Sequence, residues 1–82
     1  MADALHVTVT SVAEKLFDGQ AQSVTVPGAD GVLEVLAHHE PFVSTLRAGT
    51  VVVKVQGNED KTFDIGEGGV IEVSNNHATV LL

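Results

Sequence analysis

The chain has 82 residues and a formal charge of −7, with 11 acidic residues against 4 basic ones, and it contains no cysteine. Its size allows one domain, which we expect over residues 1–82, and the core of such a domain is small, so a partner could add to its stability. Its negative charge argues against binding to nucleic acid or anionic lipid. The absence of cysteine excludes disulfides, a thiol nucleophile and a cysteine-based zinc site. No window holds the roughly 18 apolar residues of a membrane span, so we expect a soluble intracellular protein.

The N-terminal half is predicted to form short strands. Residues 5–10 alternate apolar and polar side chains, which is typical of a strand with one buried face. Residues 12–16 predict a strand or a bend, because Phe17-Asp18-Gly19 is a turn signal. Residues 23–26 predict a strand that ends before Pro27-Gly28. Residues 32–37 predict a strand that enters a turn.

The C-terminal half continues in the same way. A new run begins at Phe42 and ends at residues 47–49. Residues 50–56 form the clearest strand, with alternate valines on one face, although Val52 is apolar on the polar face. Polar turns then separate strands at residues 62–65, 70–74 and 77–82, and the turn Asn75-Asn76 contains two residues that tolerate positive φ. These strands, with no long segment of helical period, predict an all-β fold, a sandwich or a barrel.

The residues that could carry chemistry are few. In an extended segment His38 and Glu40 would share a face while His39 would point away, so only two metal ligands converge where zinc or iron needs three or four. No Ser-His-Asp arrangement is present, and the acidic pair Glu59-Asp60 lies in a polar turn. The glycine-rich segment 66–69 precedes a strand rather than the helix that a phosphate site requires, so we interpret it as a hairpin turn.

Three motifs, in order and without gaps, point to a known family. Residues 28–49 fit G-x-x-G-x-L-x-V-L-x-x-H-x-P-x-x-x-x-L-[RK]-x-G, which resembles the central motif of the epsilon subunit of F-type ATP synthases. Leu16-Phe17-Asp18-Gly19 is similar to that family's M/L-F-x-G turn. Residues 68–73 and 79–81 are similar to its closing pair of strands.

The resemblance implies a β-sandwich of about ten short strands in two mainly antiparallel sheets of five. It implies a non-catalytic central-stalk subunit without a cofactor, present as a monomer within the complex. The subunit docks on the gamma subunit and the c-ring and couples rotation to ATP synthesis driven by protons or sodium. It lies at the cytoplasmic face of the membrane, or the equivalent thylakoid face, without inserting into lipid. The helical hairpin that inhibits ATP hydrolysis in many members would follow the last strand, so we expect either an excised domain or a short epsilon subunit.

Two interfaces follow from the resemblance. The expected c-ring contact consists of Ala29, Asp30, Gly31, Val32 and His39. The expected gamma contact consists of Ser11, Thr45, Leu46 and Val52. The alternative from a different class is a free-standing β-domain that binds a small ligand or a metal.

Overall fold

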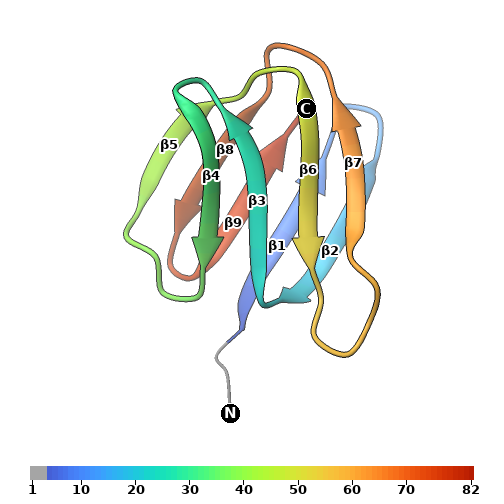
Figure 1. The fold of residues 1–82 in the computed structure, drawn as a ribbon, viewed down its shortest axis with the longest axis vertical. Coiled ribbons are helices and arrows are strands. Elements are labelled where there is room, and N and C mark those ends of the chain that lie inside the picture. The colour runs from blue at the N-terminus through green and yellow to red at the C-terminus, as the bar shows by residue number, and fades with distance from the viewer. Residues whose placement is uncertain (1–3) are drawn as a thin grey trace.

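The computed structural model describes residues 4–82 as nine strands in two layers (Figure 1). The strands are β1 (Leu5–Thr10), β2 (Lys15–Ala21), β3 (Ser23–Gly28), β4 (Gly31–Leu36), β5 (Phe42–Thr45), β6 (Gly49–Lys54), β7 (Lys61–Ile65), β8 (Val70–Ser74) and β9 (His77–Leu81). A five-stranded sheet has the order β2-β1-β9-β8-β5, and a four-stranded sheet has the order β4-β3-β6-β7. The predicted all-β sandwich is confirmed.

All pairs among these strands are antiparallel except the parallel pair of β1 and β9. In Figure 1 the odd-numbered strands run up and the even-numbered strands run down. The connections at residues 11–14, 29–30, 46–48 and 66–69 therefore gather at one end, called the upper end here, together with the end of β9. The connections at residues 22, 37–41, 55–60 and 75–76 gather at the opposite, lower end.

The core lies between the sheets and follows the predicted period of two. Along β1, for example, Leu5, Val7 and Val9 are buried while the residues between them are partly exposed. The buried apolar side chains are Leu5, Val7, Val9, Ala21, Val24, Val26, Val35, Leu46, Val51, Val53, Ile65, Ile71, Val73, Ala78 and Val80. Most are β-branched valines and isoleucines, which suit a pleated and half-buried surface.

Several boundaries differ from the prediction. Phe17-Asp18-Gly19 is not a turn but the middle of β2, and the turn comes earlier, at residues 11–14. β3 runs on through Pro27, which is tolerated because its pairing with β6 ends at Thr25 and no ladder bond on that side needs the missing N–H. The expected tenth strand is reduced to a single bridge between Gly28 and Leu46, which leaves the second sheet with four strands among residues 4–82.

The turn residues show where positive φ is needed. Asn75 and Asn76 adopt φ of 51° and 59°, so the prediction for this turn is confirmed. His38 also has a positive φ, 64°, and residues 37–38 form a turn. The extended geometry assumed for this segment is therefore wrong at His38, whose backbone is left-handed.

Candidate functional site

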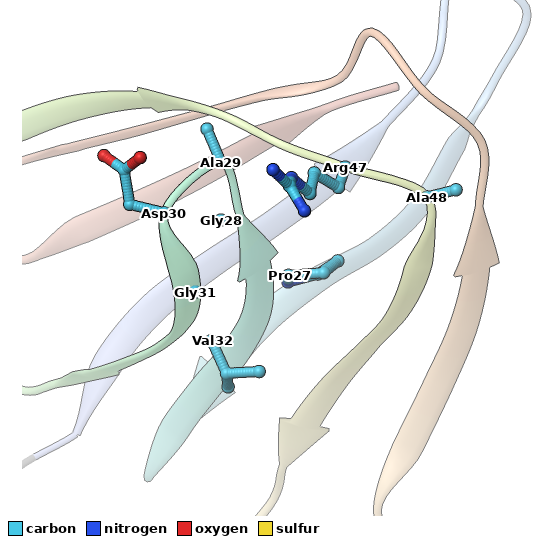
Figure 2. A pocket seen from close by; sticks show the side chains of 8 residues that line it. All are labelled: Pro27, Gly28, Ala29, Asp30, Gly31, Val32, Arg47 and Ala48. Atoms are coloured by element: carbon cyan, nitrogen blue, oxygen red, sulfur yellow. The ribbon is translucent and has the colours of Figure 1, made fainter.

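A shallow pocket opens at the upper end, where the β3–β4 turn meets the connection from β5 to β6 (Figure 2). Its volume is about 420 Å³. The lining residues are Pro27, Gly28, Ala29, Asp30, Gly31, Val32, Arg47 and Ala48. Four of the five residues expected at the c-ring, Ala29 to Val32, are therefore brought together here.

Backbone hydrogen bonds hold the two walls of the pocket against each other. The Ala29 N–H donates to the Thr45 carbonyl at 3.0 Å, and the Arg47 N–H donates to the Pro27 carbonyl at 2.8 Å. The Leu46 N–H donates to the Gly69 carbonyl at 2.8 Å, which ties the same segment to the β7–β8 turn. Because consecutive residues are anchored in this way, the backbone at Arg47 is fixed relative to the β3–β4 turn.

Two glycines permit the tight β3–β4 turn. Gly31 has φ of +137°, a conformation that side-chain-bearing residues rarely adopt. A Cβ at Gly28 would lie 2.7 Å from the Gly31 carbonyl oxygen and 2.9 Å from Leu33 Cδ1, so the chain has no room there for a side chain. The glycines of the family motif thus set the shape of the pocket's outer wall.

The pocket contains one basic and one acidic residue, and they do not pair. Within residues 4–82 the ion pairs are His6–Asp18 and Lys15–Asp18, so neither Arg47 nor Asp30 belongs to one. Figure 2 shows the Arg47 guanidinium over the pocket and the Asp30 carboxylate on the far side of the turn, pointing away from it. The site therefore offers two separate charges to a partner.

His39 does not belong to this site. It follows β4 at the lower end, whereas Asp30 precedes β4 at the upper end, so the six residues of the strand, on the order of 20 Å, separate them. His39 Nδ1 lies 2.8 Å from the Glu40 carbonyl oxygen, and its ring packs 5.0 Å from that of Phe42. Grouping His39 with residues 29–32 was wrong, because neighbours of one strand in sequence can lie at its two ends.

The four residues expected at gamma do not form one surface either. Leu46 is only 3% exposed and packs in the core, so its prediction as a contact residue is wrong. Val52 lies on the outer side of the four-stranded sheet, opposite Thr25 and Thr62 in the register. Ser11 and Thr45 belong to the upper end of the five-stranded sheet. Placing Val52 with them was wrong, because β6 and β5 belong to different sheets.

The outer face of the five-stranded sheet carries a row of apolar and β-branched side chains near the upper end. Thr10 is paired in register with Leu81, Leu81 with Val70, and Val70 with Thr45. These four residues are called the outer row. Leu81 is 48% exposed, and Val43, two positions before Thr45 on the same side of β5, is 69% exposed. Ser11 follows the row, and its Oγ accepts the Ala13 and Glu14 N–H groups in the β1–β2 turn.

A polar cluster on the same face was not found from the sequence. His6 hydrogen-bonds to Asp18, and its ring centroid lies 4.4 Å from that of His77. Thr8 Oγ1 lies 2.9 Å from His77 Nε2 and 3.2 Å from Asp18 Oδ1, while Lys15 Nζ lies 3.2 Å from Asp18 Oδ2. The hydrogen bonds from His6 and then Lys15 lower the pKa of the Asp18 carboxyl to about 2.

The signal for this cluster lies in the strand pairing. His6 and His77 are direct partners in the parallel pair of β1 and β9, 71 positions apart in the chain, so sequence spacing alone does not connect them. No group of three or more histidine, cysteine or acidic side chains within residues 4–82 is arranged to hold a metal ion. Those residues also form no helix, and so none long and apolar enough to cross a membrane.

The motifs, the two-sheet fold and the glycine-shaped turn define a class of small β-sandwich domain. Residues 4–82 match the family described as the β-sandwich domain of the ATP synthase delta/epsilon chain. The chain belongs to this family. It is 37% identical over 81 residues to the ATP synthase epsilon chain of Herminiimonas arsenicoxydans and 43% identical over 77 residues to that of Caulobacter vibrioides.

The relatives differ in length. The chain spans 58% of the Herminiimonas protein but 87% of the Caulobacter one. Among solved structures, it is similar to a chain in the cryo-EM structure of the Euglena gracilis mitochondrial ATP synthase containing OSCP, F1 and the c-ring. The TM-score is 0.86 at 24% identity, over 95% of this chain and 49% of that one. At that identity the likeness shows the fold.

Proposed function

We propose that this chain acts as the epsilon subunit of the central stalk of an F-type ATP synthase that translocates protons or sodium. It docks on the gamma subunit and the c-ring, couples rotation to ATP synthesis, and performs no chemistry itself. It lies peripherally on the F1 side of the membrane, which is the cytoplasmic side in bacteria. The observation that carries this proposal is the family match over residues 4–82.

The upper end contacts the c-ring through Ala29, Asp30, Gly31 and Val32. Two features of the turn support this assignment. The turn lies at the tip of its hairpin, and its exposed Val32 and its Asp30, which forms no ion pair within residues 4–82, give a partner both an apolar and a charged contact. The pairing of β3 with β4 up to Gly28 and Gly31, and the hydrogen bond from the Ala29 N–H to the Thr45 carbonyl, hold the turn in place before binding, which reduces the entropy lost when the partner is bound.

Gamma docks on the outer row of the five-stranded sheet, with Ser11 and Val43 at its border. A protein interface of standard size buries about 800 Å² per partner around a few desolvated side chains. Leu81, Val70 and Val43 supply apolar side chains of this kind on one side of the sheet. The four-stranded sheet then faces away from gamma.

The experiment is a co-purification of tagged chain with gamma and c-ring from detergent-solubilised membranes of the organism that encodes it. The expected result is gamma and c subunit at fixed stoichiometry with one copy of this chain. Native mass spectrometry of the isolated chain tests the alternative. A small ligand or metal retained at unit stoichiometry, together with failure to recover gamma, would overturn the proposal in favour of a free-standing binding domain.

A further inference from the structure

The pocket at the upper end holds a guanidinium that forms no ion pair within residues 4–82, and we infer that it receives a carboxylate side chain from the docking partner. Resting on the proposed function, this inference assigns to Arg47 the recognition of an aspartate or glutamate on the c-ring. The acidic side chain enters between the β3–β4 turn and the β5–β6 connection. Arg47 recognises the negative charge of this side chain.

The first argument is that Arg47 has no acidic partner among residues 4–82, although acidic residues are abundant in the chain. The chain has 11 acidic and only 4 basic residues, and Lys15 is already paired with Asp18. Asp30 lines the same pocket but points away, and the Glu67 carboxylate accepts the Ala48 N–H at 2.9 Å. The positive charge of Arg47 is therefore available to pair with an acidic group of a docking partner.

The second argument is that the position of Arg47 is fixed. Its N–H is bonded to the Pro27 carbonyl, and the residues before and after it are bonded to Gly69 and Glu67. Leu46, buried in the core, anchors the same segment. A guanidinium on a fixed backbone loses less freedom on binding than one on a mobile loop.

The third argument concerns the chemistry of the occupant. A guanidinium presents a planar fork of donors that matches a carboxylate with two parallel hydrogen bonds. Pro27, Val32 and Ala48 are apolar residues that line the same pocket, and a contact that excludes water there strengthens the ion pair. The charge of −7 opposes the approach of a phosphate-rich lipid surface, whereas one carboxylate on a protein loop meets the local positive charge.

The test uses ATP synthase membranes stripped of their own epsilon subunit, to which the purified chain is rebound. We expect Arg47→Glu to weaken rebinding about tenfold at low salt, because an attraction becomes a repulsion, and the difference to shrink at high salt. Lys54→Glu, the same charge change at an exposed site near the lower end of β6, is the matched control and should bind like wild type. Circular dichroism melting checks that both variants are folded.

A zero-length cross-link identifies the carboxylate. Carbodiimide activates a carboxylate, and a neighbouring amine then attacks the activated carbon to form an amide while the urea leaves. Arg47→Lys places an amine at this position, whereas the wild-type guanidinium does not react. A cross-link from residue 47 to an aspartate or glutamate of the c subunit, absent in wild type, is the expected product.

The outcomes separate the two proposals. If the wild-type chain does not rebind to the stripped membranes, the proposed function fails. If it rebinds and Arg47→Glu rebinds equally well, the carboxylate site is refuted while the function stands. A cross-link from residue 47 to gamma, or no cross-link at all, would also overturn the assignment. So would a result in which Arg47→Glu weakens binding to pure anionic-lipid vesicles as much as it weakens binding to the membranes.

Discussion

At the residue scale, Gly28 is the position where a single atom matters most. A Cβ there would sit 2.7 Å from the backbone oxygen of Gly31, which cannot rotate away as a side chain can. We expect Gly28→Ala to lower the free energy of unfolding by about 1–3 kcal/mol, the usual cost of overpacking. Urea denaturation of the isolated chain measures this change.

Gly66 provides the control for that variant. It lies in the β7–β8 turn, where no heavy atom of the described residues other than its own chain neighbours comes within 4 Å of the position that a Cβ would take, and its φ is not in the left-handed region. Gly66→Ala should therefore be neutral or stabilising by up to about 1 kcal/mol, because alanine restricts the unfolded chain. Equal destabilisation by both variants would contradict the close contact at Gly28.

Asp18 gives the chain a pH dependence in strong acid. Its pKa falls from 3.8 to about 2 in the folded protein, first because of the His6 hydrogen bond and then because of the Lys15 hydrogen bond. The depressed pKa means that the carboxylate is favoured in the folded state. Its contribution is present above about pH 4 and is lost as the pH falls towards 2.

The measurement compares melting temperatures of wild type and Asp18→Asn between pH 5 and pH 2. The wild type should lose more stability across this window than the variant, which has no carboxyl to protonate at this position. Asp64→Asn, which alters an exposed carboxylate hydrogen-bonded only to Thr50 in the part of the chain described here, serves as the reference. Parallel curves for wild type and Asp18→Asn would rule out the shifted pKa.

At the scale of the element, periodicity predicted most strands because each buries one face. The alternation along β1 and β6 identified the core residues of those strands correctly, and the turn at Asn75-Asn76 also came from local residue preferences. β2 was misread because Phe17-Asp18-Gly19 carries a local turn signal. Pairing with β1, from Ala21 back to Phe17, outweighs that signal in the folded chain.

The candidate site was only partly predictable, for a physical reason. Residues 29–32 could be placed because they are contiguous in a turn. The pocket also needs Arg47, which the bridge between Gly28 and Leu46 places beside the β3–β4 turn. This bridge depends on where β5 ends, which the sequence does not show. The same limit applies to His6 and His77, which meet only through the parallel pair of β1 and β9.

Substitutions in β8 measure how much one buried strand contributes to the stability of the core. Ile71 is completely buried and lies between β5 and β9. We expect Ile71→Ala to cost about 2–5 kcal/mol and Ile71→Val about 0.5–1.5 kcal/mol in the free energy of unfolding, since a larger cavity costs more. Val43→Ala, on the exposed side of β5, should change it by less than about 0.5 kcal/mol. Chemical denaturation of the three variants would contradict this if the losses did not follow that order.

At the scale of the whole molecule, the sandwich separates its two proposed contacts. The turn at residues 29–32 and Arg47 lie at the upper end, while the outer row covers the flank of the five-stranded sheet next to it. A domain of this size is marginally stable by itself, so binding to the proposed partners would contribute a large share of its stability. Stability and docking are therefore linked, and melting reports on both.

This linkage gives a prediction for the gamma interface. Gamma at about 100 times its dissociation constant adds about 2.7 kcal/mol to the folded state, which raises the melting temperature of a domain this small by on the order of 10–20 °C. Leu81→Asp places a charge in the outer row. It should abolish most of that rise while leaving the melting temperature of the isolated chain nearly unchanged, because the side chain already faces solvent.

Leu36→Asp is the matched control, since Leu36 is 53% exposed against 48% for Leu81 but lies on the outer side of the four-stranded sheet. Its variant should keep the full rise with gamma. The measurement is differential scanning fluorimetry of wild type and both variants, with and without gamma. If Leu36→Asp loses the rise and Leu81→Asp keeps it, gamma docks on the four-stranded sheet, and Val52 rather than the outer row lies at the centre of the contact.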